Sequence, residues 1–459
     1  MKRIVSVFLV FTFALSLGSS TLWARSTTAG QAGEAVARWL RADAKPLGAV
    51  LGDEVDDITP YADQTGAVAY YVVALEPAGF VVVSADDRIE PIIAYSEHGA
   101  FDPSPENPLG SLVSRDLSAR IAAARRSSEG AEKSPENVAK QRRWRTLTQS
   151  SAGAISLQIA DPISDIRIAP LIQSRWSQSS VCGATCYNYY TPNHYPCGCV
   201  ATAIAQIMLY HRHPVDSIGI RGFTIEVDGV EEYAATRGGD GAGGPYRWDY
   251  MLDDPWGNCA QLTSQHRQAI GALCYDVGIA ANMSYEASGS AAYYGPIAKA
   301  LVSTFDYGDA QTRAVSEVGE HLWDMINANL DARLPVALGI VNDESGHAVI
   351  ADGYGYIGTT LYHHINFGWA GSSDAWYNLP DFGNYPSYDT IDTCTYNIYP
   401  DGAGQIISGR VIDAAGRPVT NAIVSAQRAE VRAGGLFTTT SDERAFTRSP
   451  GFRPIPPTR

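Results

Sequence analysis

Basic residues are scarce in this sequence of 459 residues. It contains 34 lysines and arginines against 49 aspartates and glutamates, so that its formal net charge is −15. This acidic balance argues against nucleic acid or an anionic membrane surface as a partner, and it favours solubility. The sequence also lacks an internal repeat, and beyond residue 17 it has no apolar stretch long enough to cross a bilayer.

Cysteine is uncommon as well, and the pattern that would indicate zinc is missing. The four cysteines nearest one another do not have the spacing of paired C-x-x-C motifs, so we expect no metal site. In an exported protein the cysteines can form disulfides, and setting one aside as a catalytic thiol leaves an even number, whose pairing we leave open. The seven cysteines are Cys182, Cys186, Cys197, Cys199, Cys259, Cys274 and Cys394.

The N-terminus has the composition of a secretory signal peptide. Lys2 and Arg3 precede a mostly apolar stretch over residues 5–17, and Leu22-Trp23-Ala24 is a suitable cleavage site. A membrane anchor is the alternative, but the apolar stretch falls short of the roughly 20 residues that a membrane span needs. We therefore expect residues 1–24 to be removed, giving a secreted, extracellular protein with no membrane attachment.

Residues 25–150 are interpreted as a first domain followed by a connector. A helical spacing over 32–42 precedes strand-like runs over 67–75, 79–84 and 91–95. The segment 114–145 is rich in charge and poor in aromatic residues, although Leu117, Ile121 and Ala124 could form a short amphipathic helix. We interpret it as the tail of the first domain followed by an exposed connector that is open to proteases. Its cluster Arg142-Arg143-Trp144-Arg145 offers basic cleavage sites.

Residues 160–400 are expected to form the large domain. Its helical patterns come first and its strand patterns later, which favours an α+β fold over an alternating α/β fold. Residues 403–459 are expected to form an apparently incomplete β module, a partial β-sandwich whose strands at 405–413 and 422–427 are joined by a turn. The expected helices are 199–211, 262–277, 294–305 and 318–330, and the strands are 334–341, 347–353 and 360–367.

Cys199 lies at the first turn of the most strongly patterned helix. Val200, Ile204 and Ile207 recur at helical spacing after it, so the helix is expected to be buried. The unpaired N–H groups and the dipole at a helix start favour a thiolate, which is the nucleophilic form of cysteine. A structural half-cystine or an inert buried thiol is the alternative that the helix pattern alone leaves open.

His347 strengthens the catalytic interpretation of Cys199. It follows Gly346 at the start of an apolar strand, about 150 residues after the cysteine, a separation typical of cysteine peptidases whose pair meets only in the fold. Asn366 could hydrogen-bond and orient the imidazole as a neutral third member, and Trp369 could shield that bond. Upstream, Gln178 could donate to a developing oxyanion together with the Cys199 backbone N–H.

Together these segments resemble the streptopain family of secreted bacterial cysteine peptidases. The resemblance rests on Trp176-Ser177-Gln178, on Cys199-Val200-Ala201-Thr202-Ala203 with Ala205-Gln206-Ile207-Met208, on Gly346-His347-Ala348, and on Asn366 with Gly368-Trp369. Residues 285–290 resemble the substrate-side loop of that family, and residues 79–96 resemble its inhibitory propeptide. The segment from 407 to 426 is similar to carboxypeptidase-regulatory-like modules.

The resemblance implies a role for each matching residue. Cys199 corresponds to the nucleophile, His347 to the general base, Gln178 to the oxyanion donor and Asn366 to the orienting residue. The residues expected to contact substrate are Ser290, Gly346 and Trp369. The family is papain-like in fold, cleaves peptide bonds with broad specificity and needs no cofactor.

Two departures from the family pattern bear on this assignment. Phe367 stands where the family commonly has tryptophan, which leaves the shielding of the pair to Phe367 and Trp369 together. Cys182 and Cys197 add thiols close to the nucleophile in sequence, and a disulfide to Cys199 would silence it.

We therefore expect a secreted cysteine endopeptidase made as a latent precursor, with protein or peptide substrates and its own prodomain as intramolecular inhibitor. One alternative is a catalytically inactive homologue that acts as a binding or inhibitory protein. Another is a thiol acyltransferase or amidase.

Overall fold

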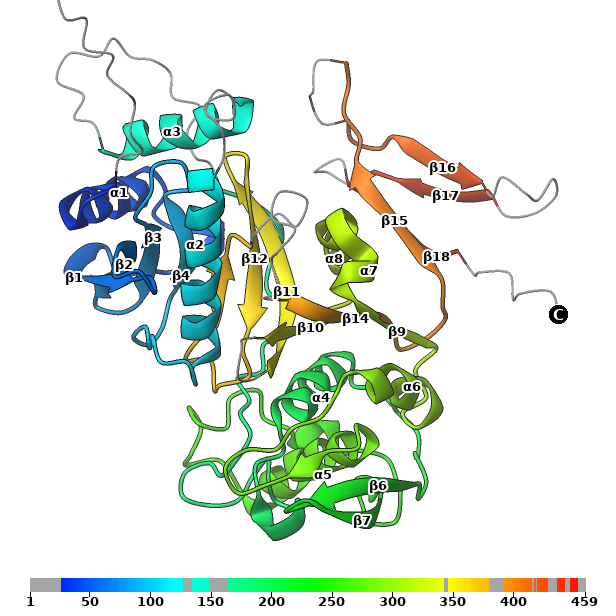
Figure 1. Ribbon diagram of the computed structural model, residues 1–459. Helices are drawn as coiled ribbons and strands as arrows, with labels where there is room; N and C mark the ends of the chain where they lie inside the picture. The colour runs from blue at the N-terminus through cyan, green and yellow to red at the C-terminus, as the bar shows by residue number, and fades with distance from the viewer. Residues whose placement is uncertain are drawn as a thin grey trace, which may run out of the picture.

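The computed structural model describes residues 26–126, 134–148, 164–341, 346–379, 391–414, 417, 419–427, 436–441 and 446–452 (Figure 1). The predicted signal peptide lies outside the described residues. Within the described part of the chain, no helix combines the length and the apolarity that a membrane span requires.

The N-terminal unit is an antiparallel sheet with helices packed against it. Helix α1 (Ala29–Ala42) is capped by Thr28, which forms a capping box with Gln31. The apolar face of the helix packs against sheet residues in a shared core. The predicted helix and strands of this unit are confirmed with small shifts of their ends. The strands are β1 (Glu54–Ala62), β2 (Val68–Glu76), β3 (Phe80–Ser84) and β4 (Ile92–Ser96).

The amphipathic helix expected around Leu117 is present, but the described part of the expected connector is helical and partly buried rather than an exposed segment. Helix α2 (Pro108–Arg126) buries an apolar face that includes Leu117, and its Arg120 and Asp116 form a buried ion pair. Helix α3 (Pro135–Thr148) buries Trp144, whose indole N–H donates to the Ile89 carbonyl. The charged composition suggested an exposed segment, but the charged side chains lie beside a buried apolar stripe. Some of them also form ion pairs, as Arg143 does with Glu90.

Eleven strands of the described residues form one sheet that runs from the N-terminal unit into the large domain (Figure 1). The order is β1-β2-β3-β4-β13-β12-β11-β10-β14-β9, with β5 paired to β11, and every pairing in this sheet is antiparallel. The two units meet where β4 pairs with β13, with Tyr95 opposite Trp376 and Ala94 opposite Tyr377; we call this contact the seam. The strands of the large domain are β5 (Ser164–Ile168), β9 (Asp309–Ala314), β10 (Val336–Val341), β11 (Gly346–Ile357), β12 (Thr360–Asn366), β13 (Ala375–Tyr377) and β14 (Ile391–Tyr399).

A helical lobe stands beside this sheet, and its helices share one core (Figure 1). Helix α4 (Cys199–His211) lies between α5 (Ser264–Ala280) and the sheet, where it contacts β11. The lobe also holds α6 (Gly295–Ser303), the hairpin of β6 (Gly222–Val227) and β7 (Val230–Ala235), and the short β8 (Ser284–Tyr285). Helices α7 (Val315–Val318) and α8 (Leu322–Asp331) follow β9 and precede β10. The predicted α+β class is confirmed, although short strands from β5 to β9 are interspersed with the helices before the run from β10 to β14.

The C-terminal segment consists of two small hairpin-like sheets. β15 (Gln405–Arg410) pairs with β18 (Phe446–Phe452), and β16 (Ile423–Gln427) pairs with β17 (Leu436–Thr440). The two strands predicted here therefore exist, but each pairs with a later strand rather than with the other. Their pairing could not be read from the sequence because both partner strands lie beyond residue 435.

Candidate active site

The start of α4 is built so that Cys199 meets the rest of the site at close range. Gly198 precedes the helix with φ at 88°, in the left-handed region that favours glycine. A Cβ at this position would meet the Met283 side chain at 2.7 Å and the Ser290 carbonyl oxygen at 3.0 Å. Gly198 is therefore required both by its backbone angle and by the approach of the segment that carries Ser290.

His347 and Cys199 meet although they come from different layers of the fold. His347 lies near the start of β11, the strand that α4 packs against, and its imidazole lies close enough to the Cys199 thiol for each group to shift the pKa of the other. The backbone N–H groups of Val200 and Ala348 also help to lower the pKa of the thiol. Helix start, imidazole and two N–H donors thus converge on a single sulfur, which remains half-buried.

The pKa values of Cys199 and His347 shift in opposite directions, and both shifts favour the charged forms. Burial works to raise the pKa of Cys199, but the His347 charge and hydrogen bond, with the two backbone donors, outweigh it and lower that pKa. Burial works to lower the pKa of His347, but the Cys199 charge and hydrogen bond, with the Phe367 carbonyl, raise it. A thiolate beside an imidazolium is the form that both shifts favour.

The imidazole is oriented by a backbone carbonyl and not by the predicted amide. The Nε2 atom of His347 lies 2.8 Å from the carbonyl oxygen of Phe367. The Asn366 side chain has other partners: it donates to the Ser174 carbonyl at 3.0 Å and accepts from the Gly368 N–H, also at 3.0 Å. The direct hydrogen bond expected between Asn366 and His347 is therefore wrong, and sequence reasoning missed the Phe367 carbonyl because any residue type supplies one.

Asn366 instead belongs to a buried polar network behind the pair. Its carbonyl oxygen accepts from Gln206 Nε2 at 3.1 Å, and Gln206 Oε1 accepts from the Ser174 hydroxyl at 2.9 Å and from the Trp176 N–H at 3.2 Å. Gln206 lies on α4, two turns after Cys199. The network therefore ties the helix of the nucleophile to the chain before Gln178 and to the peptide that orients His347.

We expect Asn366→Ala to act through this network. It should lower the free energy of unfolding by about 1–3 kcal/mol, because it leaves buried donors and an acceptor unpaired. Since the Phe367 carbonyl helps to raise the pKa of His347, the alkaline limb of any activity profile should move to lower pH. Asn329→Ala is the matched control, because Asn329 is equally buried on α8 and donates to the Met325 carbonyl. Unchanged stability with a loss of activity as large as that of His347→Ala would contradict this indirect role.

The remaining predicted residues surround the pair. The Trp369 ring stands edge-on to the His347 imidazole, with centroids 6.1 Å apart and planes at 86°. Gln178 is held beside the nucleophile because its carbonyl accepts the Cys197 N–H at 2.8 Å. Ser290 is buried, with its carbonyl against Gly198, and Gly346 is exposed next to His347.

Cys199 takes no part in the disulfide of the described residues. Cys182 and Cys259 form a disulfide, and Cys199 is a free thiol. The structure therefore contains no disulfide between Cys199 and Cys182 or Cys197. Among the residues that the structure describes, no group of three or more metal-ligating side chains is gathered in a metal-binding arrangement.

The N-terminal unit reaches the loop that orients His347. The hydroxyl of Ser96 donates to the Asp374 carbonyl at 2.6 Å, and Asn107 donates to the Ser373 hydroxyl at 3.2 Å. The Asp374 carboxylate in turn accepts the Phe367 N–H at 2.8 Å. Asp374 thus links the N-terminal unit to Phe367, the residue whose carbonyl is hydrogen-bonded to His347.

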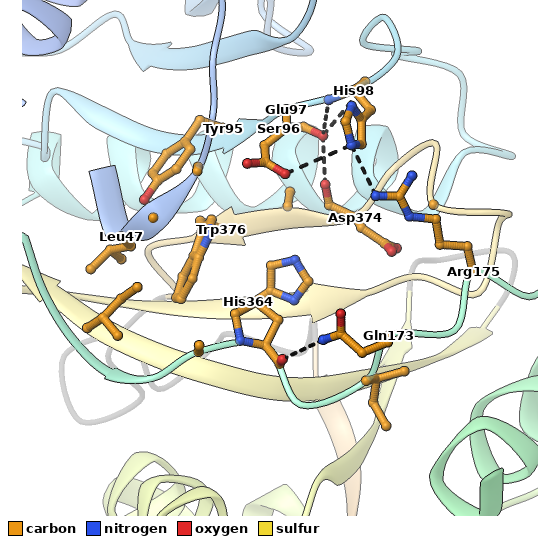
Figure 2. Close-up of a pocket in the computed structure, with 18 of the residues that line it drawn as sticks. Leu47, Tyr95, Ser96, Glu97, His98, Gln173, Arg175, His364, Asp374 and Trp376 are labelled. Atoms are coloured by element: carbon orange, nitrogen blue, oxygen red, sulfur yellow. Dashed lines mark hydrogen bonds and ion pairs between the residues drawn. The ribbon is translucent and has the colours of Figure 1, made fainter. Parts of the chain in front are cut away.

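A cavity of about 370 Å³ lies at this seam rather than beside Cys199. Figure 2 shows Glu97 and His98 from the N-terminal unit facing Arg175, His364 and Asp374 of the large domain. Burial raises the pKa of Asp374 to about 6, against the opposing charge of His364. The cavity lies between the two units with a lining of both polar and apolar residues, and that lining does not include Cys199 or His347.

Comparison with known proteins places both units. Residues 176–377 match the peptidase C10 family, and residues 24–115 match the Spi protease inhibitor family. Streptopain of Streptococcus pyogenes is 26% identical over 338 residues, covering 67% of this chain and 73% of that protein. The thiol protease/hemagglutinin PrtT of Porphyromonas gingivalis is 26% identical over 326 residues, covering 70% of this chain and 35% of that protein.

The fold itself matches a solved precursor. A structure of prointerpain A from Prevotella intermedia superimposes with a TM-score of 0.54 at 23% identity, covering 75% of this chain and 98% of that one. The match extends across both units, so the arrangement of an N-terminal prodomain on a papain-like domain is shared.

Proposed function

Because this chain belongs to the peptidase C10, or streptopain, family and carries a Spi-inhibitor-like propeptide, we propose that it is a secreted cysteine endopeptidase made as a latent precursor. The observation that carries the proposal is the pairing of Cys199, at a helix start, with His347, since each group shifts the pKa of the other toward a thiolate and an imidazolium. Secretion is supported by the signal-like composition of residues 1–24.

Each residue of the site then has a step in peptide hydrolysis. The Cys199 thiolate attacks the scissile carbonyl carbon. The π electrons of the carbonyl move to its oxygen, and the resulting oxyanion is stabilised by the Cys199 N–H and the Gln178 side chain. The His347 imidazolium protonates the leaving amine, which departs as the acyl-enzyme forms. The neutral imidazole next takes a proton from water, whose oxygen attacks the thioester and releases the acid.

The geometry around the pair supports these roles. The Phe367 carbonyl fixes the imidazole plane, and the Trp369 ring covers one edge of it, so that His347 can pass its proton only in a restricted direction. Gly198 lets the segment that carries Ser290 approach the helix start, and Gly346 directly precedes His347. Substrate contact by Ser290, Gly346 and Trp369 remains part of the proposal.

We expect a bell-shaped dependence of kcat/KM on pH. Since the pKa of Cys199 is lowered and that of His347 is raised, activity should appear as the thiol ionises on the acid side. It should be lost as the imidazolium deprotonates on the alkaline side. The two limbs belong to the pair rather than to either residue. A single limb that rises into alkaline pH would indicate a thiol without an imidazolium partner.

Replacing Gln178 should remove one oxyanion donor and leave the other. We expect Gln178→Ala to lower kcat on the order of 10²-fold or more with little change in KM. Gln173→Ala is the control, because Gln173 lies in the same segment but is exposed, and its amide donates to the Pro170 carbonyl. A Gln178→Ala variant that is as active as Gln173→Ala would remove Gln178 from the mechanism.

The reaction class is tested by the products. The trimmed enzyme should release new amino termini from a casein-type substrate at the same yield with and without an added amine acceptor. Transfer of the acyl group to the acceptor as the main product would favour an acyltransferase. No release and no labelling of Cys199 would favour an inactive binding homologue.

A further inference from the structure

Three thiols that the mechanism does not use are gathered behind the nucleophile. Cys186, Cys197 and Cys274 are each fully buried in the core of the helical lobe, and all three are free thiols in the structure. Cys197 lies two residues before Cys199, so this cluster borders the site without being part of it.

One face of α5 brings these thiols together. Gly271, Cys274 and Gly278 follow one another at helical spacing and therefore lie on one side of the helix. A Cβ at Gly271 would meet the Cys186 carbonyl oxygen at 2.6 Å, and one at Gly278 would lie 3.6 Å from the Cys197 carbonyl oxygen. The two glycines let α5 approach both segments, and Cys274 lies between them.

Of its two neighbours, Cys197 acts on Cys274 at the shorter range. The Cys197 side chain raises the pKa of Cys274 both as a hydrogen-bonding group and through its charge, whereas Cys186 acts only through its charge. We propose that Cys197 and Cys274 form a second disulfide in the secreted protein, beside the bond between Cys182 and Cys259. The proposal is independent of the catalytic function.

The chemistry is an ordinary thiol–disulfide exchange. A thiolate of one cysteine attacks a disulfide oxidant, such as oxidised glutathione or the disulfide of a protein oxidase, and displaces one of its thiols. The second cysteine then displaces the other thiol, so that two protons and two electrons pass from the protein thiols to the oxidant. Burial raises the pKa of Cys274, so the exchange should take place before α5 has packed.

The bond would fix the approach to the nucleophile. The Cys197 N–H donates to the Gln178 carbonyl at 2.8 Å, and Gly198 and Cys199 follow directly. A link from Cys197 to Cys274 would anchor this turn to α5 and would close a long loop, which restricts the unfolded chain. Cys199 would stay reduced and free.

Peptide mapping without reduction tests the pairing directly. The full-length Cys199→Ala chain, which cannot cleave itself, is exported into an oxidising periplasm, trapped with N-ethylmaleimide in acid denaturant, digested and analysed by mass spectrometry. We expect one linked peptide pair that contains Cys197 and Cys274 and another that contains Cys182 and Cys259, with Cys186 and Cys394 alkylated. Alkylation of both Cys197 and Cys274, or pairing of either with Cys186, would overturn the proposal.

Thermal unfolding gives a second measurement that does not depend on mapping. In the same background, Cys274→Ser should lower the Tm by several degrees in oxidising buffer, and a strong reductant applied during refolding should abolish most of that difference. Cys394→Ser is the matched control, because Cys394 is a buried free thiol on β14 and its effect on the Tm should be the same with and without reductant. A Cys274→Ser effect that is equally insensitive to reductant would show a packing role only and contradict the bond.

Discussion

Replacing Cys199 with alanine should abolish peptide hydrolysis, with a loss of at least about 10⁴-fold in kcat, because no other group at the start of α4 can form the acyl-enzyme. The fold should survive, since the side chain is small and half-buried. Steady-state hydrolysis of a peptide by the trimmed enzyme gives the measurement, and far-UV circular dichroism checks the fold.

Two comparisons sharpen this result. Cys394→Ser should keep wild-type turnover, because Cys394 lies on β14 and its thiol contacts the Arg313 carbonyl. His347→Ala should lose about as much as Cys199→Ala, and the double variant little more, because members of a catalytic unit are not additive. Wild-type turnover by Cys199→Ala would refute the assignment of the nucleophile.

The precursor should be latent, and trimming should raise its activity by a large factor. The N-terminal unit extends the catalytic sheet through the seam and contacts the loop that orients His347. We expect release by cleavage between about residues 127 and 160. The Arg142–Arg145 cluster is a poor site within that range, because α3 holds it in a helix with Trp144 buried. N-terminal sequencing of the product, taken together with activity over time, provides the test.

The seam offers variants that should loosen this latency. Arg120 of α2 donates to the Asn378 side chain at 3.0 Å, and the Tyr377 hydroxyl donates to Asp116 at 2.7 Å. Breaking this buried cluster with Arg120→Ala should cost about 3 kcal/mol and should speed processing. Arg313→Ala is the control, because it removes an exposed ion pair with Glu317 that is worth little.

Self-processing can be separated from latency. The Cys199→Ala precursor should stay intact when incubated alone, and it should be trimmed when wild-type enzyme is added. A full-length precursor that is already as active as the trimmed form would contradict latency while leaving the catalytic assignment untouched.

Periodicity and composition anticipate much of the fold but not its charged helices. The helix 199–211 matches α4 at both ends, because its apolar residues recur at a period that only a helix satisfies. Helices α2 and α3 were obscured, since Asp116, Arg120 and Arg143 dominate the local composition while their charges are paired in the fold. The β6–β7 hairpin was not predicted, because most residues of β7, including Tyr233, are exposed and its sequence therefore lacks the apolar alternation of a half-buried strand.

The site follows the same division. Side chains with distinctive chemistry, Cys199 and His347, could be identified from their sequence neighbours. The Phe367 carbonyl and the Ala348 N–H could not, because backbone groups occur at every position and only the fold selects them. Gln206 belongs to the segment that carries the family resemblance, but its partners could not be predicted, since a glutamine side chain can donate and accept in many arrangements.

The central claim is that Cys199 is a thiolate activated by His347. The most direct test is the rate at which an electrophilic peptide probe labels the trimmed enzyme, followed by mass spectrometry as a function of pH. Labelling should be confined to Cys199, should reach one equivalent, should remain fast well below the usual pKa of a thiol, and should become slow in His347→Ala. Labelling at another cysteine, or a Cys199 rate that rises only near the ordinary thiol pKa and is unchanged in His347→Ala, would contradict the claim.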